Sequence, residues 1–223
     1  MPVNIKQQHE ADEIKYRNAA ARAPEIAVWA RSFIHGIEVP KPNLRKRLAG
    51  SSLALALDLH DSMCALAAIG SRSAIHVLAR SVVENYARGF WLACVATPHE
   101  IDRFVAPKRG GSVERLALTL KPLLKRIHAA KKGEQSRLGI DTENAHVLDS
   151  LAHGDLGLMN LRNISGYEVG SSSTTALTYA MLLTGATIAV SCAETFVREI
   201  LDDEPRSLKV FEDGGILIKK TFA

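Results

Sequence analysis

The 223-residue sequence predicts an all-α fold, an up-and-down helical bundle built as a single domain. Hydrophobic residues make up 47% of the chain, which is enough for a sizeable core, while aromatic residues make up only 5%. Alanine and leucine dominate the apolar positions, and this composition favours close-packed helices over sheets. Signals that begin and end helices recur from one end of the chain to the other.

The N-terminal part divides into three expected helices. In the first, which is charged and rich in alanine, Pro24 is expected to break or restart the helix. A basic turn, PKPNLRKR, follows at 40–47, and its Pro42 is suited to open the next helix. Gly70 and Ser71 then separate the second helix from the third. The three helices are expected over 5–36, 43–69 and 72–96.

The C-terminal part begins with a strong helix-start signal, TPHE at 97–100, in which Thr97 caps, Pro98 opens and Glu100 completes a capping box. The tail SLKVFEDGGILIKKTFA pairs two β-prone runs around Asp213-Gly214-Gly215, which predicts a small hairpin. Further helices are expected over 112–131, 142–163 and 175–202. The single domain, 1–223, thus comprises an N-terminal helical segment at 5–40, a bundle core at 43–202 and a C-terminal hairpin at 207–222.

The net charge and the cysteine spacing limit the kinds of partner and site that the chain can have. The net charge of +4 and the pI near 9.0 suit a phosphate-bearing partner without requiring one. The three cysteines show no CxxC or Cys/His ligand spacing, so we expect no metal site, no cofactor and no disulfide framework. The N-terminus lacks a signal-peptide core, and buried thiols are typical of a reducing compartment, so a cytoplasmic location is expected.

One segment, 176–193, is uncharged over eighteen residues, the lower limit for a membrane-spanning helix. It also contains threonine, serine, tyrosine and glycine, and it leads directly into an amphipathic stretch. These features are typical of a central bundle helix, so no membrane insertion is expected.

Polar side chains follow lines along two of the expected helices. His76, Arg80, Glu84 and Arg88 fall within about 120° of one another on a helix of 3.6 residues per turn. They form either a solvated face with ion pairs four residues apart or a polar seam inside the bundle. A second line comprises His146, Ser150, His153 and Asn160.

The segment SSLALALDLHDSMCALAAIG at 51–70 favours the seam, because its charges form only a narrow stripe. Asp58 and Asp61 are carboxylates in a stretch where nearly every residue is apolar or small, and burying an unpaired charge costs several kcal/mol. Arg80 and Arg88 are the nearest cations across the tight turn, so we expect one network that joins the two helices.

The segments LALALDLHDSM, ARSVVENYARGFWL and DSLAHGDLGLM together resemble uncharacterised bacterial helical proteins related to the HEPN (higher eukaryotes and prokaryotes nucleotide-binding) superfamily. The resemblance covers roughly 50–200 and consists of an R-x-x-x-E segment before an aromatic helix end and a downstream Ser-x-x-His. These features correspond to Arg80, Glu84, Trp91, Ser150 and His153. The resemblance implies a HEPN-like bundle and a homodimer, with Phe90-Trp91 and the helix 175–202 as the expected contributors to its interface.

Two functions follow from these observations. The first is a non-catalytic module that binds a ligand or partner through a polar seam. The alternative is a metal-independent RNA-cleaving toxin or phage-defence ribonuclease, whose partners would be RNA and a cognate antitoxin. In it His153 transfers the proton, Arg80 holds the phosphate and Glu84 orients Arg80. In HEPN ribonucleases four to six residues lie between the arginine and the histidine on one helix, whereas here Arg72 and His76 come closest, with three residues between them.

Overall fold

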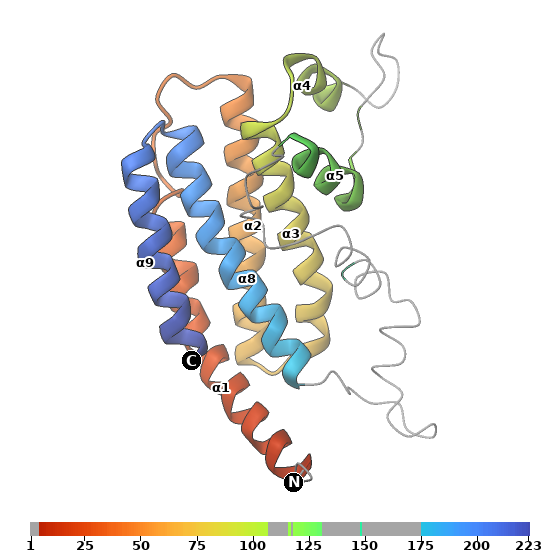
Figure 1. The fold of residues 1–223 in the computed structure, drawn as a ribbon, viewed down its shortest axis with the longest axis vertical. Helices are drawn as coiled ribbons and strands as arrows, with labels where there is room; N and C mark the ends of the chain where they lie inside the picture. The colour runs from red at the N-terminus through yellow and green to blue at the C-terminus, as the bar shows by residue number, and fades with distance from the viewer. Residues whose placement is uncertain (1–4, 107–115, 117, 131–147, 149–174) are drawn as a thin grey trace.

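The structure is a computed structural model that describes residues 5–106, 116, 118–130, 148 and 175–223, with side chains from Glu10 onward (Figure 1). Every regular element in these ranges is helical, which confirms the all-α prediction. The described elements are α1 (Ile5–Arg31), α2 (Leu44–Ala68), α3 (Arg72–Cys94), α4 (Pro98–Val105), α5 (Leu120–Ala130), α8 (Thr175–Thr195), the π-helix η1 (Phe196–Ile200) and α9 (Glu204–Phe222).

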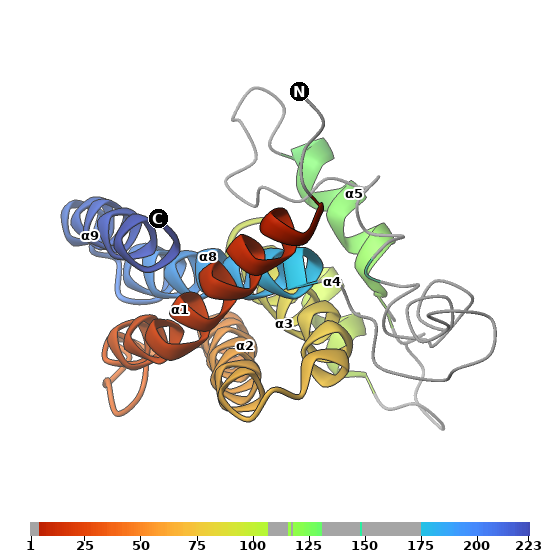
Figure 2. The same ribbon diagram turned by 90° about the horizontal axis from the view of Figure 1, so that it is seen from below.

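The helix α8 lies at the centre of the bundle. It packs against α1, α2, α3 and α9, and Figures 1 and 2 show it between α9 and α3. Its sequence contains no charge before Glu194, so nearly its whole surface is suited to burial against other helices. Gly185 allows α2 to approach closely, because a Cβ there would lie 2.9 Å from Cδ2 of His60.

An antiparallel pair, α2 and α3, forms the most extensive helix contact in the described chain. Gly70 adopts a φ of 75° in the short turn between them, a conformation that glycine enters without a steric penalty. Gly89 lets the helices approach, because a Cβ there would lie 2.8 Å from Cγ of Leu53. Arg45 then donates hydrogen bonds to the carbonyl oxygens of Leu92 (2.8 Å) and Ala96 (2.5 Å), which places a cation at the carboxyl end of α3.

Several expected helix boundaries agree with the structure, and the start signals explain them. Thr97 and Glu100 form the predicted capping box at the start of α4. The start of α2 differs in one respect, because Asn43 rather than Pro42 begins it. The Asn43 side chain accepts a hydrogen bond from the backbone N–H of Lys46 at 2.8 Å.

The expected break at Pro24 does not occur, and α1 runs through this residue as one helix. A proline inside a helix costs about 3 kcal/mol, because it removes a backbone hydrogen bond and its ring crowds the preceding turn. Residues of α1 at helical spacing are fully buried and offset this cost: Ala19, Ala23, Ile26 and Ala30. Tertiary packing therefore overrides the local signal.

The predicted C-terminal hairpin is wrong, because the same residues form α9. Asp203 caps this helix by accepting a hydrogen bond from the backbone N–H of Arg206 at 3.1 Å, and Pro205 lies in its first turn. The buried positions of α9, which are Ser207, Val210, Gly214 and Thr221, follow helical rather than alternating spacing. The Asp-Gly-Gly sequence serves helix packing here, since Gly214 faces Val190 of α8.

The two adjacent glycines of α9 give a matched test of this packing. A Cβ at Gly214 would lie 2.4 Å from Cγ1 of Val190, whereas a Cβ at Gly215 would meet nothing within 4 Å. We expect Gly214→Ala to lower the free energy of unfolding by about 1–3 kcal/mol through overpacking. Gly215→Ala should raise it by up to about 1 kcal/mol through helix propensity. Urea denaturation measures both, and equal losses from the two variants would contradict the packed helix.

Candidate polar site on α3

Three side chains on α3, Arg80, Glu84 and Arg88, form a continuous ion-paired group that we call the α3 row. Glu84 accepts from Nη1 of Arg80 at 2.9 Å through Oε2 and from Nη2 of Arg88 at 2.6 Å through Oε1. The three side chains are 17–23% exposed, so the row lies partly buried rather than on an open surface. Two guanidinium groups share one carboxylate, which leaves the row with a net positive charge.

Asn85 extends the α3 row by fixing one of its guanidinium groups. Its side-chain oxygen accepts from Nη1 of Arg88 at 3.0 Å, and its amide nitrogen donates to the carbonyl oxygen of Ser81 at 2.8 Å. Arg88 is therefore held on two sides, by a carboxylate and by an amide that is itself anchored to the helix backbone. This arrangement reduces the rotamer freedom that Arg88 would otherwise lose on binding an anion.

His76 does not belong to the α3 row, although the sequence places it on the same line. Each step of four residues turns the helix by a further 40° or so, which carries His76 into the interface with α8. There it is fully buried, and its Nε2 lies 3.2 Å from Oγ1 of Thr178. Burial lowers the pKa of His76 to about 4, so its imidazole is neutral at pH 7.

His60 of α2 is a second buried histidine. It is fully enclosed, its Nε2 lies 3.7 Å from Sγ of Cys64, and Gly185 of α8 lies against its ring. Burial lowers the pKa of His60 to about 4, despite an opposing effect of the nearby Asp61, and burial raises the pKa of the Cys64 thiol to about 12. Both groups are thus neutral packing residues at pH 7, as the sequence predicts for this cysteine.

Asp58 and Asp61 pair with Arg31 of α1 instead of with the α3 row. Nη2 of Arg31 forms an ion pair with Asp61 and lies 3.7 Å from Oδ1 of Asp58, to which Nε2 of His35 also comes within 3.6 Å. These carboxylates are 34–54% exposed, so the pairs lie at the surface. The expectation of one network across α2 and α3 is therefore wrong, because α1 packs on α2 and brings the nearer cation.

The second expected polar line lies outside the described residues. His146, Ser150, His153 and Asn160 all belong to it, so their pairing with Arg80 stays a prediction. Leu148, within the same stretch, is described, and it is helical and buried.

A polar cluster that the sequence analysis missed joins α1, α3 and α8. Arg72 donates to both carboxylate oxygens of Glu13, at 2.8 and 2.7 Å, and to Oγ1 of Thr175 at 3.0 Å. Its guanidinium also lies 4.7 Å from the ring centroid of Tyr16. Burial raises the pKa of Glu13, but hydrogen bonds from Arg72, Arg17 and Thr175 outweigh it and hold that pKa below its usual range. The sequence pattern does not reveal this cluster, because its members belong to three helices that are far apart in the sequence.

A second missed cluster lies where α8 becomes η1. Glu194 is almost fully buried, and it accepts from Nη1 of Arg198 at 2.7 Å, while Nε of Arg198 donates to Glu199 at 2.7 Å. In the π-helix the backbone N–H of Leu201 donates to the carbonyl of Phe196, five residues earlier, at 3.1 Å. A pattern based on 3.6 residues per turn does not reveal such a wide turn.

The aromatic end of α3 packs inside the chain. Trp91 is fully buried, Phe90 is nearly so, and the Trp91 ring meets the Phe104 ring of α4 edge-on at 6.0 Å. The expectation that Phe90-Trp91 and the helix 175–202 supply a dimer interface is therefore wrong for the aromatic pair. For the helix, most of the surface is already covered by neighbouring helices.

One helical stretch, Thr175–Ile200, is long and apolar enough to cross a membrane, with a mean hydropathy of 1.6 in its most apolar window. The central helix of a bundle has the same composition, and 56% of that window is buried by other parts of the chain. Among the described residues, no group of three His, Cys, Asp or Glu side chains is arranged to hold a metal ion.

Comparisons with protein-family models, with curated proteins and with solved structures find no match for this chain. The functional argument rests on the site itself. The α3 row holds two guanidinium groups on one helix face, and one of them, Arg88, is oriented by Glu84 and Asn85; guanidinium groups bind carboxylates and phosphates through paired hydrogen bonds.

Removing the shared carboxylate of the α3 row tests its structural role. We expect Glu84→Gln to lower the free energy of unfolding by about 1.5–3 kcal/mol, because two partly buried guanidinium groups lose their common counter-charge. The matched control, Asp61→Asn, breaks a more exposed ion pair and should cost at most about 1 kcal/mol. Equally small losses in urea denaturation would show that the row is a solvated surface.

The buried histidines predict a pH dependence of stability. An unfolded histidine binds a proton near pH 6.5, whereas burial lowers the pKa of His76 in the folded chain to about 4. The unfolded state therefore binds more protons between these values, and the free energy of unfolding falls as the pH falls through this window. We expect His76 to contribute up to about 2 kcal/mol of loss between pH 7.5 and 5.

Denaturation curves of His76→Gln at pH 7.5, 6 and 5 measure this contribution. The variant should lose less stability than the wild type over the same pH range, whatever its stability at pH 7.5. His99→Gln, at the exposed start of α4, is the control and should keep the wild-type slope. A slope in His76→Gln equal to that of the wild type would mean that His76 is accessible to protons in the folded state.

Proposed function

We propose that the protein is a non-catalytic, HEPN-like helical module that binds an anionic ligand or partner through the α3 row. The observation that carries the proposal is the shared contact of Glu84 with both Arg80 and Arg88. The contact orients two guanidinium groups and leaves a net positive charge on a partly exposed helix face. A guanidinium has five N–H donors, so Arg88 keeps donors beyond its contacts with Glu84 and Asn85.

The HEPN relationship is part of this proposal and is supported by the motifs themselves. Arg80 and Glu84 of the R-x-x-x-E segment are in direct contact, so the motif has a physical role in this chain. The partners that fit a cationic row are RNA, through its phosphates, and an acidic surface of a cognate antitoxin. We place this activity in the cytoplasm, in agreement with the cysteine usage.

A homodimer is also proposed, with a different surface from the one first expected. Three apolar side chains on the outer face of α9 are more than half exposed: Leu208, Phe211 and Ile216. They lie at the edge of the bundle, where α9 packs on only one side (Figure 2). An exposed apolar strip of this kind supports pairing with a second copy.

A second candidate function is a metal-independent RNA-cleaving toxin or phage-defence ribonuclease. The specific observation in its favour is the 2.9 Å contact of Glu84 with Arg80, since the mechanism requires a carboxylate that orients the phosphate-binding arginine. In that mechanism the ribose 2′-oxygen attacks the phosphorus and the P–O5′ bond breaks, which leaves a 2′,3′-cyclic phosphate and a 5′-hydroxyl. His153 transfers the proton from the 2′-hydroxyl toward the leaving 5′-oxygen, and Arg80 stabilises the charge on the phosphorane.

A binding and cleavage assay on the same samples tests the two functions. The probes are a single-stranded RNA panel and an acidic polyglutamate peptide, both labelled for fluorescence anisotropy, in excess chelator. We expect saturable binding of at least one probe without cleavage, and about tenfold weaker binding by Arg88→Gln. Lys219→Gln removes one exposed charge from the far end of α9 and serves as the control.

The outcomes separate the candidates. RNA cleavage by the wild type that disappears in His153→Ala and in Arg80→Ala, while both variants stay folded, would replace the binding module by the ribonuclease. Absence of binding to either probe, or equal weakening by Arg88→Gln and Lys219→Gln, would overturn the role of the α3 row.

A further inference from the structure

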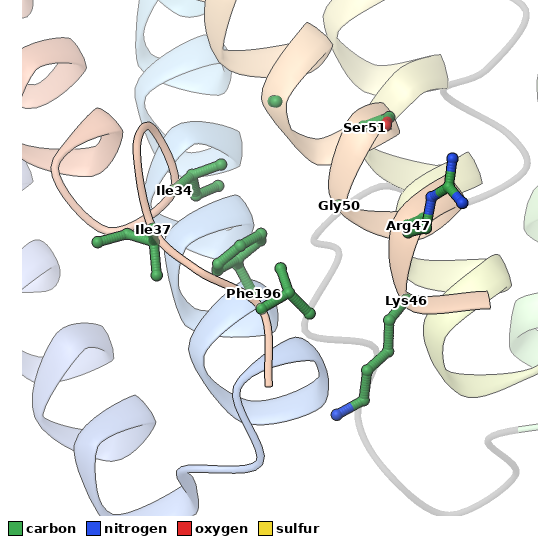
Figure 3. Close-up of a pocket in the computed structure, with 9 residues that line it drawn as sticks. Ile34, Ile37, Lys46, Arg47, Gly50, Ser51 and Phe196 are labelled. Carbon is green, nitrogen blue, oxygen red and sulfur yellow. The ribbon is translucent and has the colours of Figure 1, made fainter. Parts of the chain in front are cut away.

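A hollow of about 310 Å³ opens at the end of the bundle where the α1–α2 connection meets the first turns of α2 and η1 (Figure 3). Its apolar lining comprises Ile34, Ile37, Val39 and Phe196, and its cations are Lys46 and Arg47. Figure 3 shows Ile34, Ile37 and Phe196 on one side and the two cations on the α2 side. Its volume lies at the lower end of the roughly 300–1,000 Å³ typical of ligand pockets.

The π-helix and a glycine shape this hollow. Phe196 is the first residue of η1, and its ring lies against α2 at Gly50, where a Cβ would come within 3.3 Å of Cε2 of the ring. The ring therefore forms a wall that spans from the end of α8 to α2. π-Helical turns of this kind are frequent at functional sites, because they reposition a side chain without ending the helix.

The two cations at the hollow, Lys46 and Arg47, differ in their contacts. Nζ of Lys46 donates to the carbonyl oxygen of Ile200 at 3.0 Å and pairs with Asp202 at 2.7 Å, so this ammonium is largely satisfied. Arg47, one residue further along α2, is exposed and forms no ion pair with another described residue. Lys46, Arg47 and Asp202 together leave one net positive charge at the rim.

We propose that this hollow binds a small organic carboxylate with an apolar tail, of the kind represented by a medium-chain alkyl carboxylate. The tail would cover the apolar wall formed by Ile34, Ile37 and Phe196, and the carboxylate would pair with the Arg47 guanidinium. An alkylammonium of the same length would gain the same apolar contact but would meet a rim of like charge. The site is separate from the α3 row and does not depend on the function proposed for it.

Calorimetric titration with octanoate and with octylamine at pH 7.5 tests the chemistry of the ligand. We expect saturable binding of one octanoate per chain and no measurable binding of octylamine. Arg47→Gln should weaken octanoate binding about tenfold, because it removes a charge-assisted contact. Lys219→Gln, an equal loss of charge at the opposite end of the bundle, should bind as the wild type does.

A second variant and a measurement on the wild type test where octanoate binds. Ala54→Leu adds bulk to a residue that lines the hollow and should abolish octanoate binding. Because this variant can also disturb α2, nuclear Overhauser contacts between octanoate and the Phe196 ring of the wild type provide an independent readout. Equal binding of octylamine, an unchanged affinity in Arg47→Gln, or octanoate contacts away from Phe196 would each overturn the proposal. Binding of an acidic peptide but not of octanoate would do so too, in favour of a protein-docking surface.

Discussion

The enclosure of α8 is the constraint on which the described structure depends. A helix of this length with no charge before Glu194 is stable in water only if other helices cover most of its circumference. The four long helices around it do so, and glycines set how closely two of them approach: Gly185 on α8 itself and Gly214 on α9. Polar residues are buried along α8 as well, and His76 with Thr178 is one pair that joins it to α3.

Because other helices cover α8, the charged residues lie mainly at the ends and edges of the bundle. At one end Arg72 links Glu13 to the first residue of α8. At the other end Arg45 and Lys46 donate to carbonyl oxygens that end α3 and η1, where helix dipoles favour cations. Within the basic stretch at 40–47, Arg45 and Lys46 are therefore structural, whereas Lys41 and Arg47 are exposed. The side chains of the α3 row are 17–23% exposed and keep partial contact with water.

Local sequence signals predict the parts of this fold that local chemistry determines. The capping box of Thr97 and Glu100 and the Gly70 turn are such cases, because each depends on residues within one turn of the helix. Pro24 and the Asp213-Gly214-Gly215 sequence mislead because long-range packing decides their conformation. The pairing of Asp58 and Asp61 was mispredicted for a related reason. Proximity in sequence pointed to Arg80, whereas the packing of α1 on α2 supplies Arg31.

The π-turn of η1 also changes the direction of the side chains at the end of the central helix. A wide turn holds one residue more than an α-helical turn, so the residues that complete it, up to the break at 201–203, are rotated by about 100° relative to an uninterrupted α8. α9 begins only at Glu204, after a break at 201–203 in which Asp202 adopts a φ of 59°, so the contact of Gly214 with Val190 is set by packing and not by the phase of α8. In terms of sequence change, loss of a single residue from η1 would rotate the end of this segment by about 100° and turn the buried Ile200 away from its neighbours, whereas the break at 201–203 would keep that rotation from α9. By the same reasoning, the loop 32–43 tolerates changes in length far more easily, since no helical phase passes through it.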